Sequence, residues 1–308
     1  MSKILAVVPN ISEGTDEQFI EDLTARLGEI PGLLMLDVSV DRGRNRTVLS
    51  FTGDKEVVFA GGLLLYELTL KHVDMRQHEG DYPRVGAVDV FPFVPLKDAT
   101  IEEARAWADE FAQLVVERFN LPVYLFAESA RYRYRRDIDN IRAGEYEGFA
   151  GKMKDVRWKP DLGPETFPPD SGVTIIGARY PLISFKVVFS CTEEAVADAI
   201  GHLVADISGG IVRVDARVDQ ETGRAMLTVS VTDIKASPMY RVIEIIRMEA
   251  RRFGVEIRSV EMIGLIPESV LVGAAEYYMQ LKNFDHADIL ERSIQAHLDE
   301  RFLTSGDS

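Results

Sequence analysis

The chain has 308 residues, of which 46% are hydrophobic and 28% are charged, as in an ordinary folded globular protein. This composition excludes a disordered or fibrous protein, and the length, about twice that of a typical domain, predicts two subdomains with separate cores. The 35 basic and 50 acidic residues give a formal net charge of −15, which argues against a general nucleic-acid-binding protein.

Other features of the sequence limit where the protein works. No apolar run approaches the roughly 18 residues that cross a bilayer, and the amino terminus enters a predicted strand too soon for a secretory signal. Cys191 is the only cysteine, which excludes an intrachain disulfide framework and a cysteine-based zinc site. No other spacing resembles a metal site. We therefore expect a cytoplasmic protein that binds neither a membrane nor a metal.

The first half of the chain predicts alternating strands and helices. Thr15 and Gln18 have the spacing of a capping box at the start of a helix, and Thr100 and Glu103 have the same spacing further on. The predicted strands are Lys3–Val8, Leu33–Val40, Thr47–Thr52, Ala87–Val94 and Pro122–Phe126, and the predicted helices are Thr15–Gly28, Asp54–His72 and Thr100–Phe119.

The second half repeats this order. Ser237, followed by Pro238, marks a helix start, and Gln220–Gly223 marks a hairpin turn. The predicted strands are Ile183–Phe189, Ile211–Val218, Ala225–Asp233 and Val255–Ile263, and the predicted helices are Thr192–Ser208, Ser237–Gly254 and an amphipathic helix in the tail from Asn283.

The order of elements in each half is β-α-β-β-α-β, the split β-α-β or ferredoxin-like motif. We therefore predict an α+β fold of two ferredoxin-like subdomains, each a sheet covered by helices. The N-terminal subdomain is expected at 1–179, the C-terminal subdomain at 180–282, and a C-terminal helix and tail at 283–308. The proline-rich stretch Trp158–Arg179 joins the halves, and its length favours a binding loop over a passive connector.

A basic and aromatic segment, Arg131–Arg136, is a local exception to the acidic charge. Its alternation of arginine and tyrosine would suit RNA, but we favour the interpretation of a solvated helix face with stacked tyrosines. We therefore expect no nucleic-acid partner.

Two short polar segments lie beside strands in the first half. Val8–Gly14 comes directly after the first strand, where polar residues such as Asn10 commonly line a ligand crevice. Taken alone, this segment fits a simple strand-to-helix turn better. Asn45 and Arg46 lead into a hairpin strand, and an arginine there can bind a carboxylate through two hydrogen bonds.

A longer segment, Asp74–Asp89, crowds titratable side chains into a loop punctuated by glycine and proline. It holds His78, Tyr82 and Arg84, and imidazole is the usual acid–base group near neutral pH. A surface loop can be this polar by chance, but the variety of titratable groups favours a site. The rigid segment Trp158–Gly172 suits either a ligand wall or an ordered linker.

Several motifs match a known family in the same order. They are VPNISEG, NRT, DMRQHEGDYPRVGAVDVFPFVP, RAGEYEG, the W-x-PDxGP segment and GAR. In these motifs the chain resembles the glutamate formimidoyltransferase family, without a gap from Val8 to Arg179 and more weakly through Ile263–Pro267. The resemblance implies a dimeric enzyme that moves a formimidoyl group from N-formimidoyl-L-glutamate to N5 of tetrahydrofolate in histidine degradation. It also implies a folate cleft between the two subdomains.

The resemblance further implies which residues bind the ligands. Tetrahydrofolate is the co-substrate, an amino-acid donor is the other substrate, and no metal takes part. Animal members carry a fused cyclodeaminase domain, so we expect any cyclodeaminase that works with this chain to be a separate protein. The segment that matches the family's folate-binding loop consists of Gly163, Pro164, Glu165, Thr166, Phe167, Pro168, Pro169, Asp170, Ser171 and Gly172, and the expected substrate-binding residues are Asn10, Asn45, Arg46, Arg84 and Arg179.

The chain departs from the family pattern at three positions. Tyr82 stands where the family uses a histidine for proton transfer, Ser39 stands where it commonly has an aspartate, and Ser171 stands where it usually has an aromatic residue. An unperturbed phenol has a pKa of about 10, so Tyr82 is expected to be a hydrogen-bond donor or an acid but a poor base. The missing aspartate would have helped to hold the amidinium group or to orient the histidine.

Two interpretations of the catalytic group remain. In the first, His78 takes over proton transfer with Asp41 or Asp81 as its partner; its structural alternative is a hydrogen bond to the backbone that stabilises the loop. In the second, the usual reaction is lost, and the chain acts on another N-formimidoyl or N-formyl amino acid or only binds folate. We therefore name Tyr82 and His78 as the candidate catalytic residues.

Overall fold

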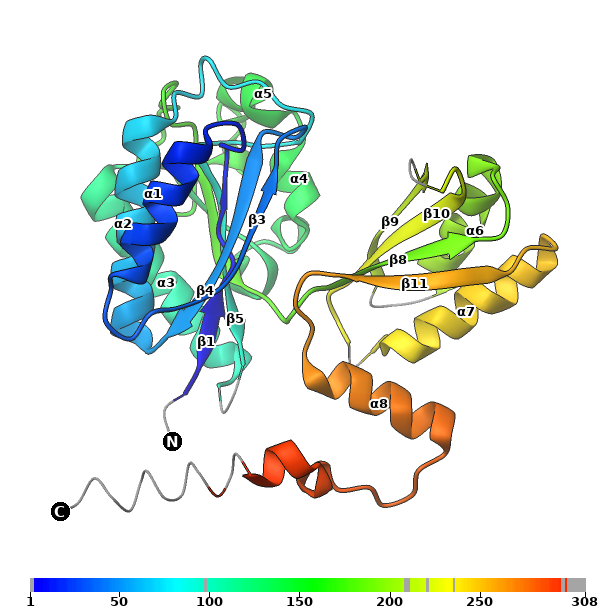
Figure 1. Ribbon diagram of the computed structural model, residues 1–308. Helices are drawn as coiled ribbons and strands as arrows, with labels where there is room; N and C mark the ends of the chain where they lie inside the picture. Colours follow the sequence, from blue (N-terminus) through cyan, green and yellow to red (C-terminus); the bar gives the residue numbers. More distant parts are fainter. Residues whose placement is uncertain are drawn as a thin grey trace. The chain divides into compact units, whose positions relative to one another are not determined.

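The structure is a computed structural model that describes residues 3–96, 99–207, 211–219, 222–234, 236–294 and 297. The chain divides into two compact units, Met1–Tyr180 and Pro181–Ser308, here called unit 1 and unit 2. Each unit combines a β-sheet with helices, so the predicted α+β class is correct (Figure 1). In the described part of the chain, no helix is both long and apolar enough to cross a membrane.

Unit 1 is built on a seven-stranded sheet with the order β1-β4-β2-β5-β7-β6, and β3 lies beside β4 at one edge. Strands β1 and β2 both pair with β4 on one side and β5 on the other. The pairs are antiparallel except for β7, which lies parallel to β5 and to β6. The strands are β1 (Leu5–Val7), β2 (Asn10–Ile11), β3 (Leu34–Asp41), β4 (Arg46–Gly53), β5 (Val88–Pro95), β6 (Val123–Leu125) and β7 (Thr174–Ala178).

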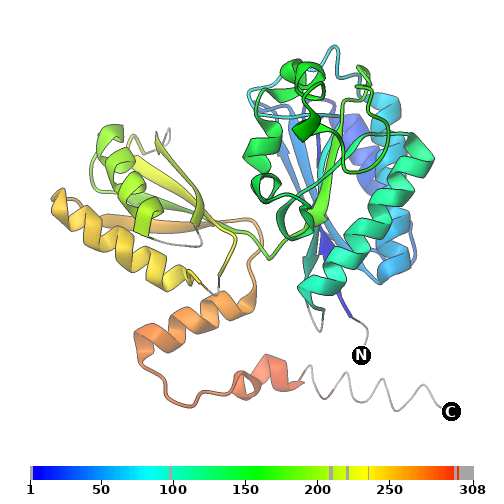
Figure 2. The same ribbon diagram turned by 180° about the vertical axis from the view of Figure 1, so that it is seen from behind.

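Helices cover both faces of this sheet (Figures 1 and 2). Alternate residues of a strand point to opposite faces, and on β6 Val123 joins the larger core under α1, α2 and α3, while Tyr124 joins a smaller core under α4 and α5. Strand β5 is buried along most of its length, as expected of a strand covered on both sides. The helices are α1 (Glu17–Gly28), α2 (Lys55–His72), α3 (Ile101–Phe119), α4 (Ile138–Arg142) and α5 (Glu145–Lys152), with short 3-10 turns at Ala127–Ser129, Arg133–Arg135 and Val156–Trp158.

The prediction that Trp158–Arg179 is irregular throughout was wrong at its end. Thr174–Ala178 forms strand β7, which is buried and pairs with β5 and β6. A short strand in which every residue is buried, with no alternation, is typical of the centre of a sheet covered on both faces. The short helices α4 and α5 were also missing from the prediction.

Unit 2 contains a four-stranded antiparallel sheet with the order β11-β8-β10-β9. Helices α6 and α7 pack against each other and α6 lies on β9 and β10, which buries a separate core around Phe185, Leu227 and Ile246. The elements are β8 (Ile183–Phe189), α6 (Glu194–Ile207), β9 (Ile211–Val218), β10 (Ala225–Val231), α7 (Met239–Arg252), β11 (Ile257–Ile263), α8 (Glu268–Met279) and a 3-10 turn at His286–Asp288.

The predicted helix starts were partly right. The capping box of Thr100 and Glu103 is present at α3. Helix α1, however, is capped by Asp16, because the Glu13 carboxylate already accepts hydrogen bonds from the Thr15 amide and hydroxyl. Helix α7 likewise begins one residue later than predicted, with Pro238 at its N-cap, and α8 was not predicted.

Two predictions fall on residues that are only partly described. Gln220 and Glu221 of the predicted hairpin turn lie outside the described residues, as does Ser208 at the predicted end of α6. The greater part of the predicted tail helix, and the whole of 301–308, lies outside them too.

Candidate active site

Two loops that are far apart in the sequence run side by side in unit 1. The Ala87 amide donates to the Ser171 carbonyl at 2.8 Å, and Gly86 pairs with Gly172 in an antiparallel bridge. A Cβ atom on Gly86 would lie 2.0 Å from the carbonyl oxygen of Val173, so only glycine allows this approach. The expected folate-binding loop is therefore joined to the segment that carries His78, Tyr82 and Arg84.

Aromatic side chains pack against the expected folate-binding loop on its inner side. The Tyr146 hydroxyl donates to the Pro169 carbonyl, and the Tyr146 ring lies 5.4 Å from the half-buried ring of Phe167. Phe149, in the core beneath, stacks on the same ring at 6.3 Å. Most other residues of the loop are exposed or half-buried, so its outer surface is open to a ligand.

Asn45 connects three loops, which gives it a structural role. Its side-chain oxygen accepts from the Gly14 amide at 2.8 Å, and its side-chain nitrogen donates to the Glu79 carbonyl at 2.8 Å. Asn45 also has a positive φ of 46°, which asparagine adopts more readily than most residues. Asn10, the other expected asparagine, donates to the Val8 carbonyl at 3.1 Å.

Both ring nitrogens of His78 have partners. Arg84 Nε donates to His78 Nδ1 at 3.1 Å, so Nδ1 carries no proton, and Nε2 then donates to the Asn45 carbonyl at 3.0 Å. This is the neutral tautomer, held by the backbone hydrogen bond that we described as the structural alternative. Neither Asp41 nor Asp81, the expected partners, contacts the ring within the described chain.

Arg84 is buried and its charge is compensated. Its guanidinium donates to the Glu147 carboxylate at 2.7 and 3.0 Å, to Glu145 at 3.3 Å and to the His78 carbonyl at 3.1 Å. The hydrogen bonds from Arg84 hold the pKa of Glu147 below its ordinary value of 4.5. Arg84 therefore connects the loop that carries Tyr82 to the start of α5, and its N–H donors are nearly all engaged before a substrate binds.

Tyr82 is oriented by a buried ion pair. Arg142 Nη1 donates to the Tyr82 hydroxyl oxygen at 3.0 Å, and the same guanidinium forms a salt bridge with Asp89. The Arg142 and Asp89 side chains are only 5% and 2% exposed, and Asp89 also accepts from the Val85 amide at 2.9 Å. Because the phenol oxygen accepts a hydrogen bond from Arg142, the Tyr82 O–H group must donate in another direction.

Arg46 is the arginine of this region that lacks a compensating charge. Its guanidinium lies 4.0 Å from the centre of the Tyr82 ring. Its Nε is buried without a hydrogen-bond partner, and no side-chain hydrogen bond or salt bridge of Arg46 is present among the described residues. A half-buried guanidinium without a partner can bind a carboxylate and loses no existing hydrogen bond in doing so.

These side chains line a small pocket in unit 1, which we call the Tyr82 pocket. The lining side chains nearly fill it, so a ligand can enter only if some of them move. Arg179, which we expected at the substrate, lies at the far end of β7, about 20 Å of extended chain from Gly172, and donates to the Tyr180 carbonyl. The pocket is lined by Ser12, Arg44, Asn45, Arg46, His78, Tyr82, Arg84 and Asp89.

Comparisons with known proteins identify the family of the chain. The model of the formiminotransferase domain, N-terminal subdomain, matches residues 4–179, and that of the formiminotransferase domain matches residues 216–298. The chain belongs to the formiminotransferase family.

Relatives in this family span most of the chain. The glutamate formimidoyltransferase of Streptococcus pyogenes serotype M1 is 34% identical over 297 residues, which cover 96% of this chain and 99% of that protein. The glutamate formimidoyltransferase of Thermoplasma acidophilum is 33% identical over 296 residues, 95% of this chain and 97% of that one. The formimidoyltransferase-cyclodeaminase of Gallus gallus is 35% identical over 288 residues, and the match covers 91% of this chain and 53% of the chicken protein.

The sequence analysis missed residues that support the pocket of this formiminotransferase-family chain. Arg142 and Glu147 are both in the RAGEYEG motif, and Asp89 is in the motif before it. The motif was noticed, but a sequence motif does not show that Arg142 turns inward to reach Tyr82. Arg142, Glu147 and Asp89 could have been found as charged residues of the matching motifs to which no role had been assigned.

The basic and aromatic segment is in part the solvated face with stacked tyrosines that we predicted, since five of its six residues are exposed and Tyr132 stacks on Tyr134, but it forms a 3-10 turn and buries Arg135. Arg135 is 1% exposed and forms a salt bridge of 2.6 Å with Asp161, whose side chain is also 1% exposed. Arg135 also donates to the Arg157 and Lys159 carbonyls at 2.7 Å. We call this the Arg135 cluster; its guanidinium is 4.9 to 5.7 Å from the rings of Tyr124, Tyr132, Tyr134 and Trp158.

Asp161 also fixes the chain that leads into the expected folate-binding loop. Its carboxylate accepts from the Leu125 amide at 2.9 Å, and its own amide donates to the Val123 carbonyl at 2.9 Å. Gly163, the first residue of the loop, follows two positions later. The Arg135 cluster is therefore a buried anchor for this loop.

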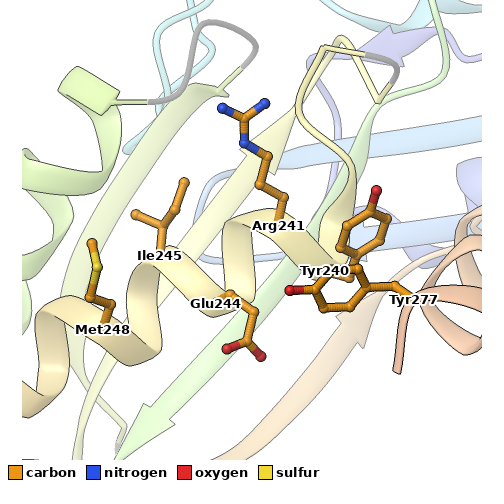
Figure 3. A pocket seen from close by; sticks show the side chains of 6 residues that line it. All are labelled: Tyr240, Arg241, Glu244, Ile245, Met248 and Tyr277. Atoms are coloured by element: carbon orange, nitrogen blue, oxygen red, sulfur yellow. The ribbon is translucent and has the colours of Figure 1, made fainter. Parts of the chain in front are cut away.

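Unit 2 has a second, more open pocket between α7 and α8, with a volume of about 290 Å³ (Figure 3). Tyr240 and Tyr277 stack there at 4.4 Å, and Glu244 is bound by Arg247 and by the Tyr278 hydroxyl. None of the motif residues lies in this pocket. In the described part of the chain, no group of acidic, histidine or cysteine side chains is arranged to hold a metal ion.

Proposed function

We propose that the protein transfers a formimidoyl group from N-formimidoyl-L-glutamate to N5 of tetrahydrofolate, as the names of its full-length relatives suggest. The observation that carries the proposal is the unpaired Arg46 over Tyr82, in a pocket adjoining the loop that matches the family's folate-binding segment. The pocket offers a positive site for a glutamate carboxylate, and the adjoining loop offers a surface for the folate.

Arg46 is the proposed carboxylate-binding residue. A guanidinium matches a carboxylate with two parallel hydrogen bonds. Arg44, 5.8 Å from the Tyr82 ring, is another cation that lines the pocket, but Asp41 lies 3.6 Å from it and compensates its charge. Asn10, Asn45, Arg84 and Arg179 stay predictions as substrate-binding residues.

Tyr82 is the proposed side chain at the reacting carbon. Attack by N5 gives a tetrahedral intermediate, and one proton must leave N5 while another reaches the glutamate nitrogen. A phenol held by Arg142 can hydrogen-bond to the intermediate or give up its proton. His78 was the other candidate; with both nitrogens engaged, we assign it to holding the loop, and a role as a base would require release of one hydrogen bond.

The folate is proposed to lie along Gly163–Gly172. Phe167 is the aromatic side chain of this loop, and aromatic faces commonly support flat rings. Ser171 stands where the family usually has another aromatic residue, so the pterin would have fewer stacking contacts here. The folate cleft between the subdomains, implied by the resemblance, stays a prediction.

Several finer assignments belong to the same proposal. The order β8-α6-β9-β10-α7-β11 with the sheet order β11-β8-β10-β9 supports a ferredoxin-like arrangement in unit 2, and unit 1 has the same order from β1 to β5. We also propose the division into 1–179, 180–282 and 283–308, a homodimer in the cytoplasm, and a separate cyclodeaminase as the next enzyme.

The test is release of free glutamate from N-formimidoyl-L-glutamate by the purified protein. We expect release only when tetrahydrofolate is present, together with an equal amount of 5-formimidoyl-tetrahydrofolate. Omitting either substrate is the control. A folded protein that releases no glutamate from this donor or from N-formyl-L-glutamate would contradict the proposal.

A further inference from the structure

Three successive residues at the start of helix α5 contact the two loops of the site. Glu145 and Glu147 bind the buried guanidinium of Arg84 on the side of the pocket. Tyr146, between them, contacts the expected folate-binding loop, because its hydroxyl donates to the Pro169 carbonyl. The first turn of one short helix therefore connects the pocket to that loop.

The backbone at the start of α5 has an unusual conformation. Gly144 has a φ of 89° and Glu145 a φ of 51°, so two successive residues are left-handed. This conformation is uncommon for a residue other than glycine and persists only where the surrounding contacts enforce it. The turn lies between Arg142, which supports the pocket, and Tyr146, which supports the loop. It therefore places two side chains, four positions apart in the chain, at separate parts of the site.

The expected folate-binding loop is attached through its backbone at one end. The Met75 amide donates to the Asp170 carbonyl at 2.7 Å. The Ala87 amide donates to the Ser171 carbonyl at 2.8 Å. Within the described residues, the Tyr146 hydroxyl is the only side-chain group from outside the loop that donates to the loop backbone. Tyr146 thus extends the attachment from the end of the loop towards its middle.

The Tyr146 ring also packs against the aromatic side chain of the loop. Its centre lies 5.4 Å from that of the Phe167 ring, and Phe149 supports Phe167 from the core at 6.3 Å. Phe167 is half-buried, so part of its ring is open to a ligand. Because Ser171 stands where the family usually has an aromatic residue, Phe167 is the one aromatic side chain of this loop. A flat ligand that stacks on the loop therefore depends on where Tyr146 holds Phe167.

We propose that Tyr146 is the positioning residue of the folate-binding loop: its hydroxyl fixes Pro169, its ring fixes Phe167, and together these contacts set the affinity for tetrahydrofolate. The inference rests on the proposed function, since it assumes that the folate lies along this loop. A loop that is already ordered loses less conformational entropy when its ligand binds. Loss of a Tyr146 contact should therefore weaken folate binding and leave the Tyr82 pocket unchanged.

The experiment measures equilibrium binding of tetrahydrofolate, by calorimetry under anaerobic conditions, to the wild type and to Tyr146→Phe. This change keeps the ring against Phe167 and removes the hydroxyl, so Kd should rise about fivefold, as expected for the loss of one neutral hydrogen bond. Tyr146→Leu also removes the ring, and Kd should rise about 30-fold. Tyr278→Phe, in unit 2, is the matched control, because it too removes a hydroxyl that donates a hydrogen bond, and Kd should not change.

Steady-state kinetics separate a positioning role from a general loss of structure. In Tyr146→Phe, KM for tetrahydrofolate should rise about fivefold. KM for N-formimidoyl-L-glutamate should stay within about twofold of the wild-type value, because the contacts of Arg46 and Tyr82 are unchanged. Damage to the whole site would raise both KM values together.

Hydrogen exchange of the wild type tests the same contact without a substitution. Tetrahydrofolate should slow the exchange of amides in the folate-binding loop and also in α5, because Tyr146 connects the two segments. Slower exchange that is confined to the loop overturns the role of Tyr146. This measurement decides the question if circular dichroism shows that Tyr146→Phe does not fold.

The outcomes separate this inference from the proposed function. If folded Tyr146→Phe has the wild-type Kd for tetrahydrofolate, or if both KM values rise together, the positioning role is overturned and the proposed function is intact. If the wild type binds tetrahydrofolate but releases no glutamate from either donor, the proposed reaction is overturned and the comparison of Kd values still decides the role of Tyr146. A wild type that does not bind tetrahydrofolate overturns both.

Discussion

The Tyr82 pocket and the Arg135 cluster use the same residue types for opposite purposes. In both, a guanidinium lies over tyrosine rings, at 4.0 Å in the pocket and from 4.9 Å in the cluster. Arg135 is closed off from water, with Asp161 and two carbonyl groups as partners. Within the described residues, Arg46 has no such partner, and it lines a pocket.

The difference lies in the compensation of charge rather than in the stacking. A buried cation needs a counter-charge and hydrogen bonds, and the donors that bind these partners are not available to a ligand. An arginine with a stacked ring but no counter-charge keeps its donors for a ligand. The Arg135 cluster therefore supports the fold, whereas Arg46 keeps the N–H donors that our proposal assigns to a carboxylate.

The largest expected effect is on stability, from breaking the Arg135 cluster. Asp161→Asn should lower the free energy of unfolding by about 3 to 5 kcal/mol, because it leaves the buried Arg135 without a counter-charge. Denaturant unfolding followed by circular dichroism measures this.

Replacing both partners gives the matched control. Arg135→Met combined with Asp161→Leu removes both charges and should cost less than Asp161→Asn alone. If the single variant unfolds at the same denaturant concentration as the wild type, the cluster is not a buried anchor and the contrast with Arg46 fails.

The next effect is on substrate binding, from Arg46. Arg46→Ala should raise KM for the glutamate donor by about 10- to 100-fold, the worth of a charge-assisted hydrogen bond, while the free energy of unfolding changes by less than about 0.5 kcal/mol. Arg258→Ala, at an exposed arginine of β11, is the control. A large loss of stability with an unchanged KM would show that Arg46, like Arg135, stabilises the fold and does not bind the donor.

The smallest effect concerns Glu147, the counter-charge of Arg84. Its pKa is lowered in the folded protein by hydrogen bonds from Arg84, so its contribution to stability is present above pH 4.5 and is lost as the pH falls through the lowered value. Because the Glu147 side chain is 62% exposed, Glu147→Gln should cost less than about 1 kcal/mol at pH 7. The difference in melting temperature between the wild type and Glu147→Gln should become smaller at pH 3. If the difference does not change with pH, the charge of Glu147 does not contribute to stability.

Much of the fold could be read from local sequence patterns. The capping box of α3 and the strands around the hairpin of β3 and β4 depend on neighbours along the chain. Strand β7 could not be read in this way, because its five residues show no alternation and follow a proline-rich loop, and only its burial between β5 and β6 explains it. Asp16 rather than Thr15 caps α1: its carboxylate accepts from the Phe19 amide, while the Thr15 amide and hydroxyl both donate to Glu13.

By itself, the sequence determined the family, the α+β class and the motif segments, because these follow from residue identity, spacing and periodicity. Only the tertiary structure decided which charges are compensated. Arg46, Arg84, Arg135 and Arg142 look alike in a sequence, and the partners of three of them come from segments 26 to 63 residues away. Whether an arginine binds a substrate or stabilises the fold depends on such distant contacts, which no local pattern encodes.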